Sequence, residues 1–336
     1  MSVAKEHPFA QFVRIIGRGP NLSRPLDEEE MFEAASMIMK GEVEPLQLGA
    51  FLCILRVRTE VPGEGAGFVR AAREFIKLPK DAPKVDVDWA SYSGKKRQLP
   101  WFLLSAIMLS QNGIKICMQG TEGHTEGRLF SRTALEHLGV PIAGSLVEAS
   151  EQIKTSNFTY LPLANFVPQL QEIIELKPIL GVRSPVNTFA RMLNPFNAPN
   201  EMQTVFHPNY QDVHRDTAEL LGQKNMAVFK GEGGEAERRP HKPVVVQMLL
   251  DGKRTEEQWP PMLEDHDYEK DEDMDLSHLG AVWNGTLDND YATGAIIGTA
   301  AIVLRLMGRA NDPDSAIKMA SEMWESRNRD KLFPAG

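Results

Sequence analysis

The stretch VDVDWASYSGKKRQLPWFLLSAIMLSQNGIKICM, from Val85 to Met118, has the pattern of a strand, a short loop, a helix and a second strand. VDVDW alternates apolar and polar residues, as a half-buried strand does. Pro100 suits the start of a helix that Gly113 ends, and IKICM follows as the next strand. A βαβ unit of this kind predicts an α/β fold with a central, mostly parallel sheet flanked by helices.

Residues 1–80 carry helical patterns instead. Two apolar faces have the spacing of one side of a helix. They are formed by Phe9, Phe12, Val13 and Ile16, and by Leu48, Phe51, Leu52 and Leu55. Asp27 and Glu30 have the spacing of a capping box at a helix start, and a further helical pattern follows Gly67. The sequence therefore predicts a helical domain over residues 1–80 and an α/β domain over residues 81–336.

Further elements are expected in the second domain. Residues 227–229 (AVF) and 244–250 (VVVQMLL) have the composition of strands. Residues 291–309 predict a buried helix, and residues 314–327 predict an amphipathic one.

Composition and charge limit the class of protein. The 336 residues carry a formal net charge of −9, and eight of the twelve residues from Glu264 to Asp275 are acidic. Nucleic-acid-binding domains are usually basic, but without the acidic run the chain is nearly neutral. No apolar run is long enough to cross a membrane, the N-terminus lacks signal-peptide features, and two cysteines do not make a disulfide framework. We expect a cytoplasmic protein.

The sequence predicts no metal site and no cofactor. No set of cysteines and histidines has zinc spacing. Asp271, Asp273 and Asp275 have the first spacings of a calcium loop, but Leu276 and Val282 stand where that loop needs glycine and glutamate. The acidic run is therefore interpreted as a solvated loop.

Two basic clusters contain the candidate binding residues. Their members are Lys95, Lys96 and Arg97 in the loop before the helix, and Arg238, Arg239, His241 and Lys242 after residues 227–229. Free backbone N–H groups and the positive end of the helix dipole favour an anion at the first loop. Because the carboxyl ends of parallel strands meet at one edge of a sheet, both clusters are expected there. Each is also compatible with a solvated surface loop. His124, in a glycine-spaced loop, is a further candidate contact.

The chain also resembles a known superfamily. Residues 31–71 (MFEAASMIMKGEVEPLQLGAFLCILRVRTEVPGEGAGFVRA) and 180–195 (LGVRSPVNTFARMLNP) are similar to segments of the anthranilate phosphoribosyltransferase and pyrimidine nucleoside phosphorylase superfamily, glycosyltransferase family three. The resemblance covers nearly the whole chain. It implies a small helical N-terminal domain, with a mid-chain contribution near residues 158–192, hinged to the larger α/β domain. It also implies a homodimer through the helical domains.

The active-site motifs of that superfamily are not retained. Its glycine-rich phosphoribosyl pyrophosphate loop corresponds to residues 92–96, and the Asn-x-Ser-Thr motif that follows corresponds to residues near 98–101. Its Lys-His-Gly-Asn-Arg motif corresponds to residues 118–122, its magnesium-binding Asp-Glu pair to Ala236 and Glu237, and its anthranilate-contacting arginine to Lys177. Without the glycines the backbone cannot approach a pyrophosphate closely, and without the acidic pair magnesium has too few oxygen ligands. The pattern resembles a bacterial branch that keeps the fold and is associated with nucleic-acid binding.

Three functions follow from these observations. The leading interpretation is a non-catalytic, homodimeric protein that contacts the phosphates of single-stranded DNA or RNA with little sequence preference. Its candidate contacts are Lys95, Lys96, Arg97, Arg238, Arg239 and Lys242. The alternative is a glycosyltransferase or phosphoribosyltransferase of altered substrate, with an interdomain cleft lined by Ser93, Gly94, Ser105, Gly120 and Lys177. The third is a scaffold whose partner binds the helical module.

Overall fold

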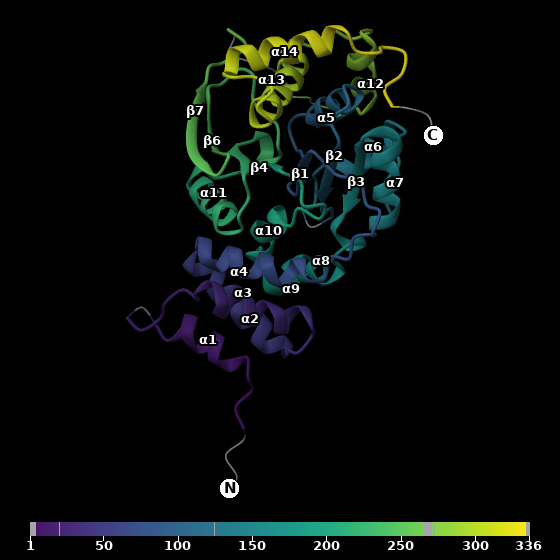
Figure 1. Ribbon diagram of the computed structural model, residues 1–336. Coiled ribbons are helices and arrows are strands. Elements are labelled where there is room, and N and C mark those ends of the chain that lie inside the picture. The colour runs from purple at the N-terminus through teal and green to yellow at the C-terminus, as the bar shows by residue number, and fades with distance from the viewer. Residues whose placement is uncertain (1–4, 20, 124, 265–270, 272, 334–336) are drawn as a thin grey trace.

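The chain folds into a helical domain and a larger α/β domain that lie one beneath the other in Figure 1. The computed structural model describes residues 5–19, 21–123, 125–264, 271 and 273–333. The α/β domain is built on a seven-stranded sheet with the order β3-β2-β1-β4-β5-β6-β7. The strands are β1 (Val87–Ser91), β2 (Ile116–Gly120), β3 (Phe158–Pro162), β4 (Asn200–Val205), β5 (Asn225–Lys230), β6 (Val244–Leu250) and β7 (Lys253–Trp259). All neighbours from β3 to β5 are parallel, whereas β6 and β7 are antiparallel, so the mostly parallel sheet is confirmed.

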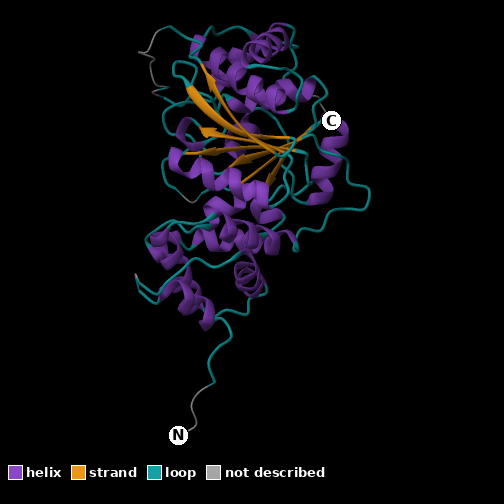
Figure 2. Cartoon of the chain, turned by 60° about the vertical axis from the view of Figure 1, so that its left-hand side comes forward, coloured by secondary structure: helices purple, strands orange, loops and turns teal. Residues whose placement is uncertain are grey.

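Helices cover both faces of this sheet (Figure 2). The helices of this domain are α5 (Phe102–Gln111), α6 (Ser131–His137), α7 (Leu146–Ser156), α11 (Gln211–Leu220), α12 (Ser277–Asn284), α13 (Asp290–Leu306) and α14 (Pro313–Glu325). Short 3₁₀ turns lie at Leu163–Asn165, Ala190–Met192, Pro208–Tyr210 and Glu232–Gly234. The C-terminal helices α13 and α14 match the two helices expected there. Fourteen of the seventeen residues of α13 are buried, because this helix packs against the sheet and against α5 within one apolar core.

The strand expected at VDVDW is present as β1, but it is not half-buried. All five residues from Val87 to Ser91 are buried, since β1 is a central strand with a parallel neighbour on each side. The alternating pattern therefore does not mark a solvent-facing side. Instead it places the carboxyl group of Asp88 in the interior, where burial, and secondly the neighbouring carboxyl of Glu201, raise the pKa of Asp88 well above its usual range.

Four helices form most of the helical domain. They are α1 (Ala10–Gly17), α2 (Glu28–Met39), α3 (Pro45–Arg58) and α4 (Pro62–Arg73). The predicted capping box is present, because the Asp27 side chain accepts from Glu30 N and the Glu30 side chain accepts from Asp27 N. The helix predicted after Gly67 begins earlier, at Pro62. Its glycines allow close packing: a Cβ at Gly67 would lie 2.2 Å from Glu28 O of α2.

Three short mid-chain helices lie beside this domain (Figure 1). They are α8 (Pro168–Glu175), α9 (Lys177–Leu180) and α10 (Val186–Phe189). A Cβ at Gly49 of α3 would lie 3.5 Å from Leu180 of α9, and the ring of Phe68 in α4 packs at 4.9 Å between centroids on Phe189 of α10. The helical domain and the three mid-chain helices thus share one apolar cluster.

Candidate anion-binding site

A cavity of about 320 Å³ lies at the carboxyl edge of the parallel strands, between the two domains. Ser93 follows β1, Val205 ends β4 and Gly233 follows β5, and all three line it. Arg56 of α3 lines it from the helical domain. In α/β sheets this edge is the usual position of a ligand, because loops from several strands meet there.

Four arginines line this cavity, which we call the arginine pocket: Arg56, Arg128, Arg183 and Arg191. The first three come from different segments of the chain, and each is held by oxygen acceptors. Arg56 Nη1 lies 3.3 Å from the Tyr210 hydroxyl, and Arg183 Nη2 donates to Thr125 Oγ1 at 2.8 Å. Arg128 Nη1 donates to the carbonyl oxygens of residues 93, 94 and 233. These bonds orient the guanidinium groups without neutralising them.

Arg191 is the most enclosed of the four, with 8% of its surface exposed. Its Nη2 donates to Ser93 Oγ at 2.7 Å, and its guanidinium lies 5.6 Å from the centroid of the Tyr92 ring. Burial lowers the pKa of Arg191, and the charge of Glu235 offsets part of that effect. An arginine side chain stays charged under these conditions, so the floor of the pocket carries a fixed positive charge.

The positive charges of the pocket act on one another. Burial lowers the pKa of Arg183, and the charges of Arg128, Arg191 and Arg56 lower it further. Within the described part of the chain, no aspartate or glutamate forms an ion pair with any of these four side chains. A bound anion would relieve this repulsion and would accept hydrogen bonds from the guanidinium groups.

The glycine-poor loop after β1 is already occupied by an acidic side chain. Glu235 Oε1 accepts hydrogen bonds from Ser93 N and Gly94 N, each at 2.5 Å. Lys95 Nζ lies 2.6 Å from Glu237 Oε1, and Glu237 Oε2 accepts from Phe102 N at the start of α5. The backbone N–H groups at residues 93 and 94 and the Lys95 cation are therefore satisfied within the protein.

Two of the six predicted phosphate contacts are not at the surface. Lys95 is 1% exposed and Arg238 is 0% exposed, so for these two residues the predicted surface role is wrong. Lys95 is buried because it pairs with Glu237. Arg238 is buried because its guanidinium packs 5.3 Å from the centroid of the Trp259 ring and donates to Pro260 O.

The other predicted cations remain accessible. Lys96, Arg97 and Lys242 are exposed, whereas Arg239 is half-buried and lies 3.9 Å from Glu232 Oε2. His241 is buried, with its ring 5.7 Å from that of Tyr291. His124 and most of the acidic run from residue 264 lie outside the described residues.

Three of the five residues of the predicted transferase cleft lie in or beside the arginine pocket. Ser93 lines the arginine pocket, and the Gly94 carbonyl accepts from Arg128. Lys177 lies beside the pocket, with Nζ 3.4 Å from the Thr125 hydroxyl that also binds Arg183.

Ser105 and Gly120 do not line the arginine pocket. The hydroxyl of Ser105 donates to Ile296 O within the core. At Gly120 a Cβ would lie 2.0 Å from Ser91 O, so glycine here serves the close approach of two strands. The prediction for Ser105 is therefore wrong, whereas Gly120, which ends β2 at the carboxyl edge of the sheet, stays a prediction.

The residues aligned with a magnesium site do not fit one. Ala236 offers no side-chain oxygen, and both oxygens of Glu237 are engaged, one by Lys95 and one by Phe102 N. Burial raises the pKa of Glu237 to about 7, even though Lys95 acts to lower it. Magnesium needs hard, ionised oxygen ligands, and this carboxyl is committed to an internal ion pair.

The arginine pocket itself was missed at the level of sequence. Two of its members, Arg183 and Arg191, lie in the segment LGVRSPVNTFARMLNP that carries the family resemblance. Their spacing of eight residues is the one signal that could have indicated them. Arg56 and Arg128 stand alone in the sequence, and nothing in their local pattern distinguishes them from surface arginines.

Comparison with known proteins defines the class to which this fold and site belong. Residues 11–76 match the helical bundle domain of the glycosyl transferase family, and residues 101–327 match its a/b domain. The chain therefore belongs to this glycosyl transferase family.

Individual relatives agree with that assignment. The chain is 28% identical to the anthranilate phosphoribosyltransferase of Ralstonia pickettii over 237 residues, which cover 69% of this chain and 68% of the relative. It is 28% identical to an uncharacterized protein of Aquifex aeolicus over 66% of this chain and 68% of that protein. The crystal structure of anthranilate phosphoribosyltransferase from Thermus thermophilus superposes with a TM-score of 0.80 over 97% of both chains at 21% identity, which shows a shared fold.

None of the helices in the described residues combines the length and the apolar composition that a membrane crossing requires.

Proposed function

We propose that the protein is a transferase of altered substrate that binds a phosphorylated sugar in the arginine pocket. The observation that carries this proposal is the set of four arginines, without acidic ion-pair partners in the described residues, around a cavity between the two domains. Charged hydrogen bonds from guanidinium groups suit phosphate oxygens, because their fork geometry matches the anion. In this proposal guanidinium groups, and not a magnesium ion, neutralise the phosphate.

The size of the cavity supports a small ligand. A volume of about 320 Å³ lies at the lower end of the range for small-molecule sites. The pocket also carries hydroxyl and amide side chains, including Ser184, Asn187 and Thr188, which suit the hydroxyl groups of a sugar. A nucleic-acid strand would place one nucleotide at most inside such a cavity.

Calorimetric titration of ribose 5-phosphate tests this proposal. The wild-type protein should bind it, and Arg183→Gln should weaken binding about tenfold or more, because a charge-assisted hydrogen bond is lost. Arg97→Gln is the matched control, since Arg97 is an exposed arginine outside the pocket, and its affinity should stay within about twofold of wild type. Equal losses in the two variants would locate the anion elsewhere.

Catalysis needs its own measurement. Phosphorus NMR of the protein incubated with sugar phosphates, phosphoribosyl pyrophosphate included, should reveal a released phosphate or pyrophosphate when a suitable acceptor is present. If ligands bind but none is turned over with any acceptor, the transferase part of the proposal fails and binding alone remains.

Nucleic-acid binding is the second candidate. Two observations favour it: Lys96, Arg97 and Lys242 are exposed, and Phe206 at the pocket is 55% exposed, as an aromatic side chain that stacks on a base would be. Against it, Asp271 of the acidic run contacts the same loop, accepting from Leu99 N at 2.7 Å. Titration with single-stranded DNA at several salt concentrations decides between the two. Strong binding that weakens in Lys96→Gln/Arg97→Gln and not in Arg183→Gln would favour the nucleic acid.

We further propose that the protein is a homodimer through its helical domain, but not through the apolar face of Leu48, Phe51, Leu52 and Leu55. Phe51, Leu52 and Leu55 are at most 1% exposed, so they belong to the core of the subunit. The opposite side of α3 instead exposes an apolar stripe with helical spacing, formed by Leu46, Ala50, Cys53 and Val57. Leu46 is 89% exposed and Val57 is 84% exposed, and an exposed apolar stripe of this kind suits a protein partner.

A further inference from the structure

Of the histidines that line the arginine pocket in the described part of the chain, only His214 is buried, with 2% of its surface exposed. It lies on α11, whose buried side packs on β4 and β5. Its Nδ1 lies 2.7 Å from Gln203 Oε1, and no other hydrogen bond to its ring is made by the described residues. The state of the imidazole therefore depends on the orientation of the Gln203 amide.

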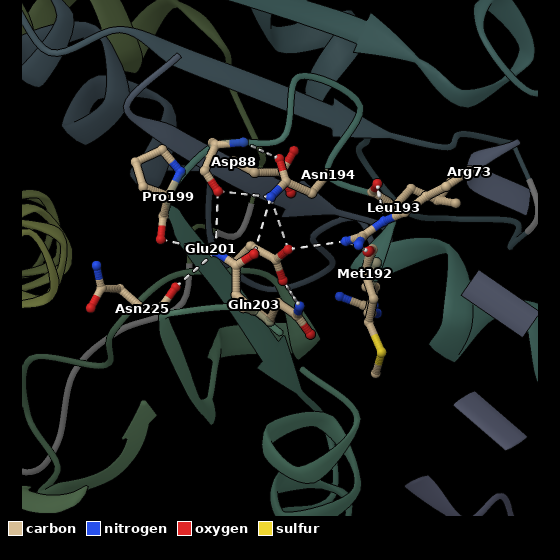
Figure 3. Close-up of polar contacts among 12 residues, drawn as sticks. Arg73, Asp88, Met192, Leu193, Asn194, Pro199, Glu201, Gln203 and Asn225 are labelled. Carbon is tan, nitrogen blue, oxygen red and sulfur yellow. Dashed lines mark hydrogen bonds and ion pairs between the residues drawn. The ribbon is translucent and has the colours of Figure 1, made fainter. Parts of the chain in front are cut away.

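A buried network behind the pocket fixes that amide. Figure 3 shows Arg73, Asn194 and Gln203 gathered around the carboxylate of Glu201 on β4. Arg73 Nη2 lies 3.4 Å from Glu201 Oε1, and Asn194 Nδ2 donates to the same oxygen at 2.9 Å. Gln203 Nε2 donates to Glu201 Oε2 at 2.8 Å.

The anchor of this network comes from the other domain. Arg73 ends α4, and it also donates from Nε to Leu193 O at 3.0 Å and from Nη2 to Met192 O at 2.8 Å (Figure 3). Burial raises the pKa of Glu201, while Arg73, Asn194 and Gln203 act to lower it. Asp88, the cross-strand neighbour of Glu201, has its pKa raised well above its usual range by burial and by Glu201, whereas Glu201 is the carboxyl that forms the ion pair with Arg73.

An ionised Glu201 determines the direction of each hydrogen bond. The carboxylate can only accept, so it receives the Gln203 NH₂ group, and Gln203 Oε1 must then point to His214. That oxygen is also an acceptor, so the proton of the neutral imidazole lies on Nδ1 and a lone pair remains on Nε2. The ring is neutral at physiological pH, because burial, and secondly the charge of Arg191, lower the pKa of His214 to about 3.

A histidine in this state accepts hydrogen bonds but is a poor base. A general base works best with a pKa near the working pH, which His214 lacks. The arginines of the pocket can only donate hydrogen bonds, so they match phosphate oxygens. The imidazole Nε2 offers the opposite property, since its lone pair repels an anionic oxygen and accepts a hydroxyl proton.

We propose that His214 Nε2 accepts a hydrogen bond from a sugar hydroxyl of a ligand whose phosphate is held by the arginine pocket. This inference rests on the proposed function and narrows its ligand to phosphate esters that carry a free hydroxyl group. Inorganic phosphate uses the arginines alone. Gln203 is a positioning residue, because it acts on the ligand only through the tautomer of His214.

Two variants of His214 separate the two ring nitrogens. In His214→Asn the amide NH₂ takes the place of Nδ1–H and keeps a donor for Gln203, but no acceptor remains at the position of Nε2. Calorimetry should show a loss of about five- to tenfold in affinity for ribose 5-phosphate, the effect of one hydrogen bond with a neutral acceptor. Affinity for inorganic phosphate should stay within about twofold. His214→Gln, which places an acceptor nearer to Nε2, should recover part of the loss.

Nitrogen-15 NMR of the histidine ring tests the tautomer directly. The wild-type protein should show a protonated Nδ1 and an unprotonated Nε2 at pH 7. Gln203→Met should shift the ring toward the Nε2–H form that a free imidazole prefers. A protonated Nε2 in the wild-type protein would overturn the inference.

The titrations distinguish two kinds of failure. If the wild-type protein binds neither ribose 5-phosphate nor inorganic phosphate, the proposed function fails, and the ligand assigned to His214 fails with it. If it binds both and His214→Asn leaves both affinities unchanged, or reduces both equally, the arginine pocket stands and the role of His214 is wrong.

Discussion

Lys95 Nζ lies 2.6 Å from Glu237 Oε1, and both side chains are almost completely buried. This contact joins the loop after β1 to the loop after β5. Since Glu237 Oε2 also accepts from Phe102 N, the pair fixes the start of α5 as well. Lys95, which the sequence predicts to contact phosphate, therefore lies in the interior of the folded protein.

Breaking this buried ion pair should be costly, whereas replacing both partners should not. Lys95→Met should lower the free energy of unfolding by at most about 3–5 kcal/mol. The loss stays below that limit because removal of Lys95 raises the pKa of Glu237 further, so that the buried carboxyl takes up a proton instead of keeping an unpaired charge. The double variant Lys95→Met/Glu237→Gln should recover most of that loss. Urea denaturation measures both, and Lys96→Met, at an exposed neighbour, is the control. A double variant as unstable as the single one would contradict this account.

The stability of the protein should depend on His214 below neutral pH. The folded pKa of about 3 lies below the ordinary value of 6.5, so between these values the unfolded chain binds a proton that the folded protein refuses. Stability is therefore lost as the pH falls below 6.5. At pH 5 the loss from this group should reach about 2 kcal/mol. His214→Asn should lack it, so urea denaturation at pH 5 and pH 7 should show a smaller difference for the variant than for the wild type.

Removing the Glu235 carboxylate, which binds the loop after β1, should make the stability of the protein depend on added anions. Glu235→Ala leaves the N–H groups of Ser93 and Gly94 without their acceptor, which costs about 1–3 kcal/mol for each donor. Thermal denaturation should show a lower midpoint, and added phosphate should raise it more than it raises that of the wild type. Glu235→Gln, which keeps an acceptor oxygen, should respond like the wild type. Equal phosphate effects in all three proteins would show that the loop does not admit an anion.

The apolar stripe of α3 should control assembly. Light scattering of the wild-type protein at micromolar concentration should give the mass of a dimer, and Leu46→Asp/Val57→Asp should give that of a monomer. The variant should keep its fold, because both side chains are more than four-fifths exposed in the subunit. A wild-type monomer would contradict the proposed dimer.

Local patterns in the sequence were sufficient for elements whose signals are themselves local. Asp27 and Glu30 predicted the start of α2, and the run from Val85 to Met118 predicted β1, α5 and β2 in the correct order. The helix start at Pro62 was placed too late, because three glycines weaken a helical pattern. Their function in α4 is tertiary: at Gly65 a Cβ would lie 2.7 Å from the hydroxyl of Thr217 on α11.

The candidate site depends on contacts that no local pattern records. Glu237 is 142 positions from Lys95, so the burial of Lys95 follows from the sheet order and not from its neighbours. The arginine pocket combines Arg56 of α3 and Arg128 of the α/β domain with Arg183 and Arg191 of the mid-chain segment that packs on the helical domain. The domain boundaries at residues 80 and 81 and the dimer remain predictions.

The position of β7 at the end of the sheet has a consequence for the protein in concentrated solution. An uncovered edge strand presents unpaired N–H and C=O groups that can extend a sheet into a neighbouring molecule. Four of the seven residues of β7 are charged: Lys253, Arg254, Glu256 and Glu257. If the β7 strands of two molecules paired in parallel register, like charges would face each other and repel. The loss of hydration of these charges would also oppose pairing between molecules. The same charged residues that leave β7 without an apolar pattern in the sequence thus oppose aggregation of the folded protein.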